Sequence, residues 1–173
     1  MRLQLLIPAL AVAQAMLSLP ALAAFPDFRA KDLNGTEVTA RTLRGQATVY
    51  LIGFSYDSRS EVEAWAKALA EPGKQMKRPA LRVIQMPVLS GSGVFARPFI
   101  ESGLSRRTPK AERANVMTST DRDALVKGLD LKDPDKGAVI ALVDAEGEMR
   151  LLLRGPVSDA KAQELARALD ALE

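Results

Sequence analysis

The sequence contains no cysteine and no histidine among its 173 residues. Without cysteine, the chain forms no disulfide, offers no thiolate nucleophile and holds no cysteine-based zinc or iron–sulfur site. Without histidine, it lacks the side chain most often used as a general base or as a transition-metal ligand. The sequence therefore excludes thiol chemistry and much histidine-dependent catalysis before any motif is considered.

Aromatic residues and unbalanced charge are also scarce. Aromatic residues make up 5% of the chain and the formal net charge is +3, which gives no basis for predicting a nucleic-acid partner. The hydrophobic fraction is 47% and the charged fraction is 26%, the profile of one globular domain rather than of a disordered or collagen-like chain. We find no internal repeat and no low-complexity linker.

The first residues have the layout of a secretory signal peptide. Arg2 gives a positive start, an apolar stretch follows, and Ala21-Leu22-Ala23 is a small-residue cleavage motif. The prediction is a signal peptide over residues 1–23 and one domain over residues 24–173, in the periplasm if the source is a Gram-negative bacterium. The alternative is an uncleaved membrane anchor, because the apolar run approaches the length that spans a bilayer.

Acidic residues gather at Asp130, Asp133 and Asp135, but their spacing does not fit a calcium-binding EF-hand loop. Lys132 and Pro134 occupy positions that would have to supply ligands. No pair of carboxylates elsewhere stands out as an acid–base pair. The sequence therefore predicts no metal site, no catalytic residue and no cofactor.

Hydrophobic patterning predicts a sheet of mixed strands. Two unbroken apolar runs, residues 47–54 and 139–144, indicate strands buried on both faces, and residues 80–88 and 149–153 indicate two further strands. Asn34-Gly35 predicts a type I′ hairpin between strands near residues 28–32 and 37–40, and residues 116–118 suggest a short strand.

Helices are predicted between these strands. A helix begins near Ser58 or Ser60, each of which has a glutamate three residues later as in a capping box, and ends at Pro72-Gly73. Trp65 lies on its apolar face, which favours a core position. Other helices are expected at 97–103, 110–117, 121–129 (with Ala124, Leu125 and Leu129 inward) and 159–172 (capped by Ser158), and a flexible loop at Ser90–Gly93. The predicted class is α/β, a mixed central sheet flanked by helices on both faces, with an N-terminal β-hairpin.

Two segments resemble the thioredoxin-like superfamily, in the branch of the peroxiredoxins and periplasmic thiol-disulfide proteins. FPDFRAKDLNGTEVTARTLRGQATVYLIGF is similar to the start of such proteins, and GAVIALVDAEGEMRLLLRG is similar to their last hairpin. The resemblance implies a thioredoxin-like fold. It also implies an attacking cysteine just after the central strand, where this chain has Ser55 to Ser60, and a cis-proline before the strand at residues 139–144, where it has Ala138. Both redox features are missing.

Within that superfamily the chain is also similar to the mitochondrial F-type ATP synthase assembly factor family and its bacterial relatives. The similarity lies in the Phe-Pro-Asp-Phe start, Trp65, the arginine-rich middle and the Leu-Val-Asp-x-x-Gly hairpin. It implies chaperone-like handling of a partner protein rather than catalysis, although fold alone does not fix function.

The candidate partner-binding residues follow from that resemblance and from the basic middle of the chain. A helix N-terminus behind the serine loop favours an anionic or carbonyl group, although capping alone explains the serines. The basic stretch 97–113 suits a partner surface or anionic headgroups, although a solvated face is the simpler interpretation. The predicted surface is the loop Ser55–Ser58 with the facing segment Lys136–Ala138, extended by the basic stretch. The full set is Ser55, Tyr56, Asp57, Ser58, Lys136, Gly137, Ala138, Arg97, Arg106 and Arg107.

Three functional hypotheses remain open. The leading one is a redox-inactive periplasmic protein that binds a protein or peptide in the cell envelope as an assembly factor or chaperone, with peripheral contact to the membrane surface. The second is a cysteine-independent enzyme that uses Tyr56 and Asp57 on a small substrate; an apolar pocket with a perturbed carboxylate would favour it. The third is an interaction subunit of an envelope complex.

Overall fold

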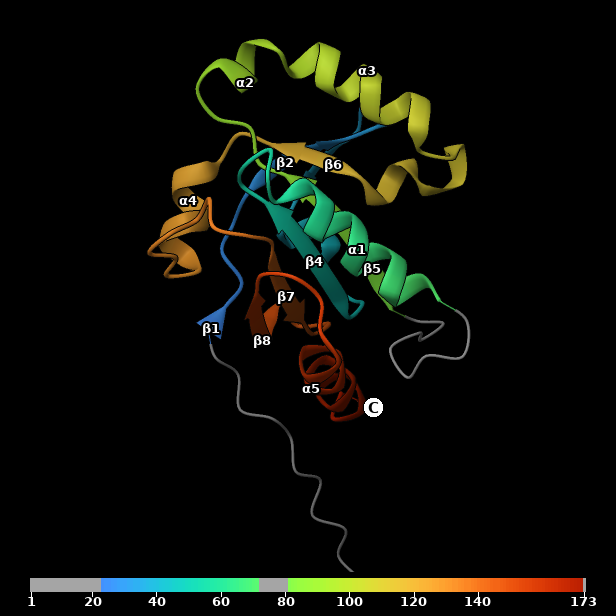
Figure 1. Ribbon diagram of the computed structural model, residues 1–173, viewed down its shortest axis with the longest axis vertical. Helices are drawn as coiled ribbons and strands as arrows, with labels where there is room; N and C mark the ends of the chain where they lie inside the picture. The colour runs from blue at the N-terminus through green and yellow to red at the C-terminus, as the bar shows by residue number, and fades with distance from the viewer. Residues whose placement is uncertain (1–22, 72–80, 173) are drawn as a thin grey trace, which may run out of the picture.

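A computed structural model describes residues 23–71 and 81–172 of the chain (Figure 1). The predicted signal segment therefore lies outside the described residues except for Ala23, as does Pro72-Gly73. The elements, in chain order, are β1 (Ala23–Ala24), β2 (Arg29–Asp32), β3 (Glu37–Thr39), η1 (Arg41–Leu43), β4 (Thr48–Gly53), α1 (Arg59–Ala70), β5 (Arg82–Pro87), α2 (Ser92–Phe95), α3 (Arg97–Arg107), η2 (Lys110–Asn115), β6 (Met117–Ser119), α4 (Arg122–Gly128), β7 (Val139–Val143), β8 (Glu148–Arg154) and α5 (Asp159–Asp170).

The central sheet is mixed and has the strand order β1-β8-β7-β4-β5. β4 runs parallel to β5 and antiparallel to β7, and every residue of β4 and of β7 is buried. This confirms the interpretation of the two unbroken apolar runs as strands covered on both faces. β5 is last in the order, and isolated bridges from Gln85 to Val116 and from Val88 to Ser119 connect its outer edge to the segment around β6.

Helices α1 and α5 cover one face of the central sheet. Val49 and Leu51 of β4 pack there with Trp65 of α1 and Leu165 of α5, as the alternation of side chains along a strand requires. Trp65 is fully buried, and its indole Nε1 donates a hydrogen bond to the Gly155 carbonyl oxygen over 3.0 Å. The predicted core position of Trp65 is confirmed.

The other face is covered by α4 and by a second sheet with the order β3-β2-β6. Tyr50 of β4 stacks on Phe25, with ring centroids 4.4 Å apart, and meets the edge of Phe28 at 5.9 Å. Burial raises the pKa of the Tyr50 hydroxyl well above its usual value, although Arg82 opposes the shift. Helices therefore lie on both faces, as predicted, and the small sheet shares the second face with α4.

The N-terminal hairpin forms where it was predicted, but its turn is different. Gly35 has a φ of +90°, whereas Asn34 is not among the residues of the described part that have positive φ, so the type I′ prediction is wrong. The Asp32 carboxylate accepts hydrogen bonds from the backbone N–H groups of Asn34 and Thr36, at 2.9 and 2.8 Å. This side-chain bridge stabilises a turn in which only the glycine needs the left-handed conformation.

The segment between β5 and α4 is more helical than its sequence predicted. α2 begins at Ser92 inside the predicted flexible loop, α3 continues past Gly103 to Arg107, and residues 110–115 form a 3-10 helix rather than an α-helix. In α4 the predicted inward position of Ala124 is wrong, because Ala124 is exposed while Leu125 and Leu129 are buried. Across residues 23–71 and 81–172, none of the helices has both the length and the apolarity needed to cross a bilayer.

Candidate functional site

The loop between β4 and α1 carries two serines at the spacing of a Cys-x-x-Cys motif. Ser55 and Ser58 stand three positions apart at the start of α1, which is where that motif places its cysteines in a thioredoxin-like redox site. The Ser58 hydroxyl donates to the Ser55 carbonyl oxygen at 2.7 Å, and the Ser58 N–H donates to the Ser55 hydroxyl at 3.3 Å. The two side chains therefore satisfy the loop's own backbone.

A second connection joins this loop to the segment before β7. The Ser55 hydroxyl donates to the Asp135 carbonyl oxygen at 3.1 Å, and the Glu61 carboxylate accepts the Ala138 N–H at 2.7 Å. Gly137 has a φ of +80°, and a Cβ there would lie 2.8 Å from Glu61 Oε2, so glycine fits where a larger residue would clash. The serine loop and Lys136–Ala138 face each other, as the sequence suggested.

The bond from Ala138 to Glu61 explains why this chain has no proline at position 138. A proline in place of Ala138 would have no N–H to donate, and the bond to Glu61 would be lost. The bonds at this helix start also correct the capping-box prediction: Ser58 makes no side-chain cap, and Glu61 and Glu63 bond to Ala138 and Arg59 instead. A long-range bond has taken the place of the local one that the spacing predicted.

Arg122 of α4 makes a third connection to the same loop. Its guanidinium donates to the Phe54 carbonyl oxygen at 3.1 Å, forms an ion pair with Asp135 at 2.8 Å, and lies 5.5 Å from the centroid of the Phe54 ring. Arg122 was not predicted as a site residue, because no sequence spacing links α4 to the end of β4.

These bonds leave little of the predicted loop site open to a partner. Ser58 is 1% exposed and Ala138 is fully buried, so neither side chain has a surface to offer. Lys136 and Asp57 are exposed, and the Tyr56 side chain is 84% exposed. Hydrogen bonds thus join the loop of residues 55–58 to the segment of residues 135–138, and we call this bonded unit the joint. The Tyr56 side chain projects from it into solvent.

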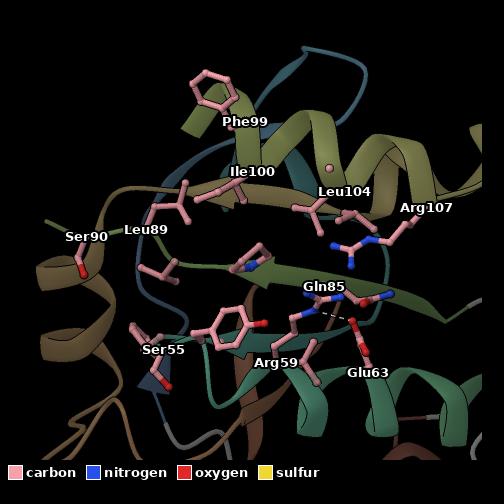
Figure 2. A pocket seen from close by; sticks show the side chains of 18 residues that line it. Ser55, Arg59, Glu63, Gln85, Leu89, Ser90, Phe99, Ile100, Leu104 and Arg107 are labelled. Atoms are coloured by element: carbon pink, nitrogen blue, oxygen red, sulfur yellow. Dashed lines mark hydrogen bonds and ion pairs between the residues drawn. The ribbon is translucent and has the colours of Figure 1, made fainter. Parts of the chain in front are cut away.

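Beside this joint lies a cleft of about 720 Å³, within the size range of ligand pockets. Figure 2 shows α3 above it, β5 along its floor, and the start of α1 below. The lining is mostly apolar and comes from five stretches of chain: Gly53 to Tyr56, the first turns of α1 (Arg59, Val62, Glu63), β5 with its following loop (Gln85, Pro87, Val88, Leu89, Ser90), α3 (Phe99, Ile100, Gly103, Leu104, Arg107) and Val116.

The three arginines predicted as one basic surface have three different surroundings. Arg97 is ion-paired with Glu101 at 2.7 Å and bonds to Thr118, which fastens α3 to β6. Arg106 and Arg107 are both exposed, but Arg106 bonds to Ser102 whereas Arg107 lines the cleft. Only Arg107 of the three is placed to meet a ligand in the cleft.

Glu101 completes the anchor of α3. Burial favours its neutral form, but hydrogen bonds from Thr118 and Arg97 outweigh burial, and the pKa of Glu101 is lowered from its usual value of 4.5. The carboxylate is therefore charged at neutral pH and holds the outer wall of the cleft in place.

The enzyme hypothesis requires an apolar pocket that contains a perturbed carboxylate, and the cleft meets only the first of these two conditions. An apolar pocket is present, but Asp57 does not line it, and the carboxylate that does, Glu63, forms an ion pair with Arg59 at 2.8 Å. In the part of the chain that the structure describes, no three acidic side chains gather closely enough to hold a metal ion. The arrangement offers binding contacts and no arranged acid–base pair.

The cleft was not predicted from the sequence, although α3 carries a signal for it. Ile100, Leu104 and Arg107 follow one another at helical spacing and so share one face of the helix. The floor comes from β5, which is distant in sequence, and no periodicity connects the two walls.

Comparison with solved structures shows the thioredoxin-like fold. A putative electron transfer protein from Aquifex aeolicus VF5 superposes with a TM-score of 0.59 at 16% identity, over 89% of this chain and 99% of that one. BsSco, of the Sco family of cytochrome c oxidase assembly proteins, gives 0.58 at 12%, over 88% and 96%. The exposed lipoprotein thioredoxin Etrx1 of Streptococcus pneumoniae gives 0.55 at 14%, over 82% and 98%.

No protein-family description and no protein of curated function matches the sequence. The resemblance to the thioredoxin-like superfamily is confirmed at the level of the fold, and the absence of cysteine fits a member without the active-site thiols. The similarity to the ATP synthase assembly factors stays a prediction.

Proposed function

We propose that this chain is a redox-inactive thioredoxin-like protein of the cell envelope that binds an apolar segment of a partner protein in the cleft beneath α3. The observation that supports it is the contrast at the start of α1. Hydrogen bonds close the loop in the redox position, and an apolar cleft opens beside it.

The cleft has the features of a protein-binding groove. Its rim carries Tyr56 and Phe99, whose side chains are 84% and 83% exposed. Aromatic side chains are enriched at protein interfaces, where burying one contributes a large share of the binding energy. All four exposed large hydrophobic residues of the described chain, Tyr56, Val94, Phe95 and Phe99, belong to the loop or to α2 and α3.

The envelope location and an assembly or chaperone role are parts of the same proposal. The signal-like segment at residues 1–23 supports export. Among the structural neighbours, one is described as an exposed lipoprotein and another as an assembly protein of cytochrome c oxidase. A protein that binds an apolar segment of a partner without catalysing a reaction could hold a subunit while its complex assembles.

Site-specific photo-crosslinking in cells tests this function. A photoreactive phenylalanine at Tyr56 and, separately, at Phe99 should capture the same envelope protein, because both positions line the cleft. Phe95 is the matched control, since its side chain is 88% exposed but does not line the cleft.

Capture should also be lost when Leu104→Asp places a charge inside the cleft. Equal capture from Phe95, or capture that survives Leu104→Asp, would contradict the proposed function.

A further inference from the structure

The cleft has two chemically different ends (Figure 2). Leu89 and Ile100 lie toward one end, and Leu104 lies in the middle. Arg107 and Gln85 lie toward the other end, and Arg59 and Glu63 lie below them in this view. A ligand that fills the cleft therefore meets aliphatic side chains with Ser55 and Ser90 at one end, and charged and amide side chains at the other.

The polar end carries one unpaired positive charge. Three charged side chains line the cleft, and two of them, Arg59 and Glu63, neutralise each other in an ion pair of 2.8 Å. Arg107 makes no hydrogen bond or ion pair with any described residue, and neither does the Gln85 carboxamide. Both line the cleft, so both offer hydrogen-bond donors to a ligand.

We infer that the occupant of this cleft is an apolar peptide segment carrying a carboxylate, which Arg107 binds with the help of Gln85. A guanidinium matches a carboxylate with two parallel hydrogen bonds, and aliphatic side chains of the segment would pack against Ile100 and Leu104. This inference rests on the proposed function, and it specifies in addition that the bound segment carries a negative charge.

The form of the cleft favours a peptide over a fatty acid. Tyr56 and Phe99 stand exposed on the rim, where they would lie against a chain that extends past the cleft. Ser90 also lines it, and a peptide backbone has groups that can hydrogen-bond to a serine hydroxyl, whereas an acyl chain has none.

A pair of matched peptides tests the inference on the full chain. One is an end-blocked, fluorescein-labelled octapeptide of serine, leucine and phenylalanine with a single glutamate; the other has glutamine in that place. We expect the glutamate peptide to bind at least about tenfold more tightly, in line with a hydrogen-bonded charge pair. Fluorescence anisotropy measures both.

Neighbouring arginines supply the control on the protein. Arg107→Glu should remove the preference for glutamate and transfer it to a lysine peptide, whereas Arg106→Glu should leave binding within about twofold, because Arg106 does not line the cleft. Circular dichroism melting of both variants checks that the fold is kept.

Each other outcome overturns the inference. Equal binding of the two peptides that Leu104→Asp abolishes would leave the proposed function standing and remove the carboxylate. Displacement of the peptide by sodium decanoate at a lower concentration than by unlabelled peptide would assign the cleft to a fatty acid. Absence of binding by both peptides would refute the inference, while the crosslinking pattern would decide the proposed function separately.

Discussion

The loop at the start of α1 and the cleft beneath α3 lie next to each other but differ in how their polar groups are used. In and beside the loop, the side chains of Ser55, Ser58 and Glu61 are hydrogen-bonded to the protein's own backbone. In the cleft, Arg107 and Gln85 find no partner in the described chain, and aromatic side chains on the rim are exposed. Polar groups that are already satisfied stabilise a fold, and unsatisfied ones beside apolar surface are available for a ligand.

The position where thioredoxin-like redox proteins keep their thiols is, in this chain, a joint that connects α1, α4 and the segment before β7. The residues between β5 and α4 provide the outer wall of the cleft beside it.

Restoring the two thiols should have the largest effect. The double variant Ser55→Cys with Ser58→Cys has the Cys-x-x-Cys spacing at a helix start, and we expect it to oxidise completely to a disulfide in oxidised glutathione. Thiol titration and mass measurement detect the bond. The control, Ser55→Cys with Ser60→Cys, has the wrong spacing; free thiols persisting in both variants would show that the loop has lost the redox geometry altogether.

Removing the joint's long-range bond should have the next largest effect. Glu61→Ala leaves the N–H of buried Ala138 without its partner and should lower the free energy of unfolding by about 1–3 kcal/mol. Glu63→Ala, in the same helix, breaks only a largely exposed ion pair and should cost no more than about 0.5 kcal/mol. Urea unfolding measures both; similar losses would mean that the loop is not a joint.

Acid should weaken the wall of the cleft by a smaller amount. Because the folded state lowers the pKa of Glu101, the stability that this carboxylate contributes is present above its usual value of 4.5 and is lost as the pH falls through the lowered pKa. The protection of the α3 amides against hydrogen exchange, taken relative to the intrinsic exchange rate at each pH, should therefore fall in acid. Glu101→Gln should remove much of that pH dependence, and an unchanged profile in the variant would show that another group anchors α3.

The sequence predicted the parts of the fold that depend on local or unbroken patterns. The run in β4, the Ser158 cap that accepts the Lys161 N–H, and the core position of Trp65 all follow from residues close in sequence. The bonds from Glu61 to Ala138 and from Arg122 to Phe54 join residues 77 and 68 positions apart. For Glu61, the local spacing predicted a capping bond that does not form.

Only part of the candidate site was predicted, because most of its contacts join residues that are distant in sequence. The meeting of the serine loop with Lys136–Ala138 was expected because the resemblance fixed where both segments lie. The cleft was not expected, because its walls come from α1, β5 and α3, and because Gly103 in α3 obscured the helical spacing of Ile100, Leu104 and Arg107. The position of such a site depends on how distant elements pack together, which local sequence patterns do not specify.

The most direct test of the central claim is a map of amide chemical shifts in the isotopically labelled protein as the glutamate peptide is added. If the peptide binds in the cleft, the amide shifts should change along β5 and α3, with the largest changes near Gln85 and Arg107, and the shifts of residues 136–138 should not change. Changes confined to residues 136–138 and the serine loop, with β5 and α3 unaffected, would contradict the central claim.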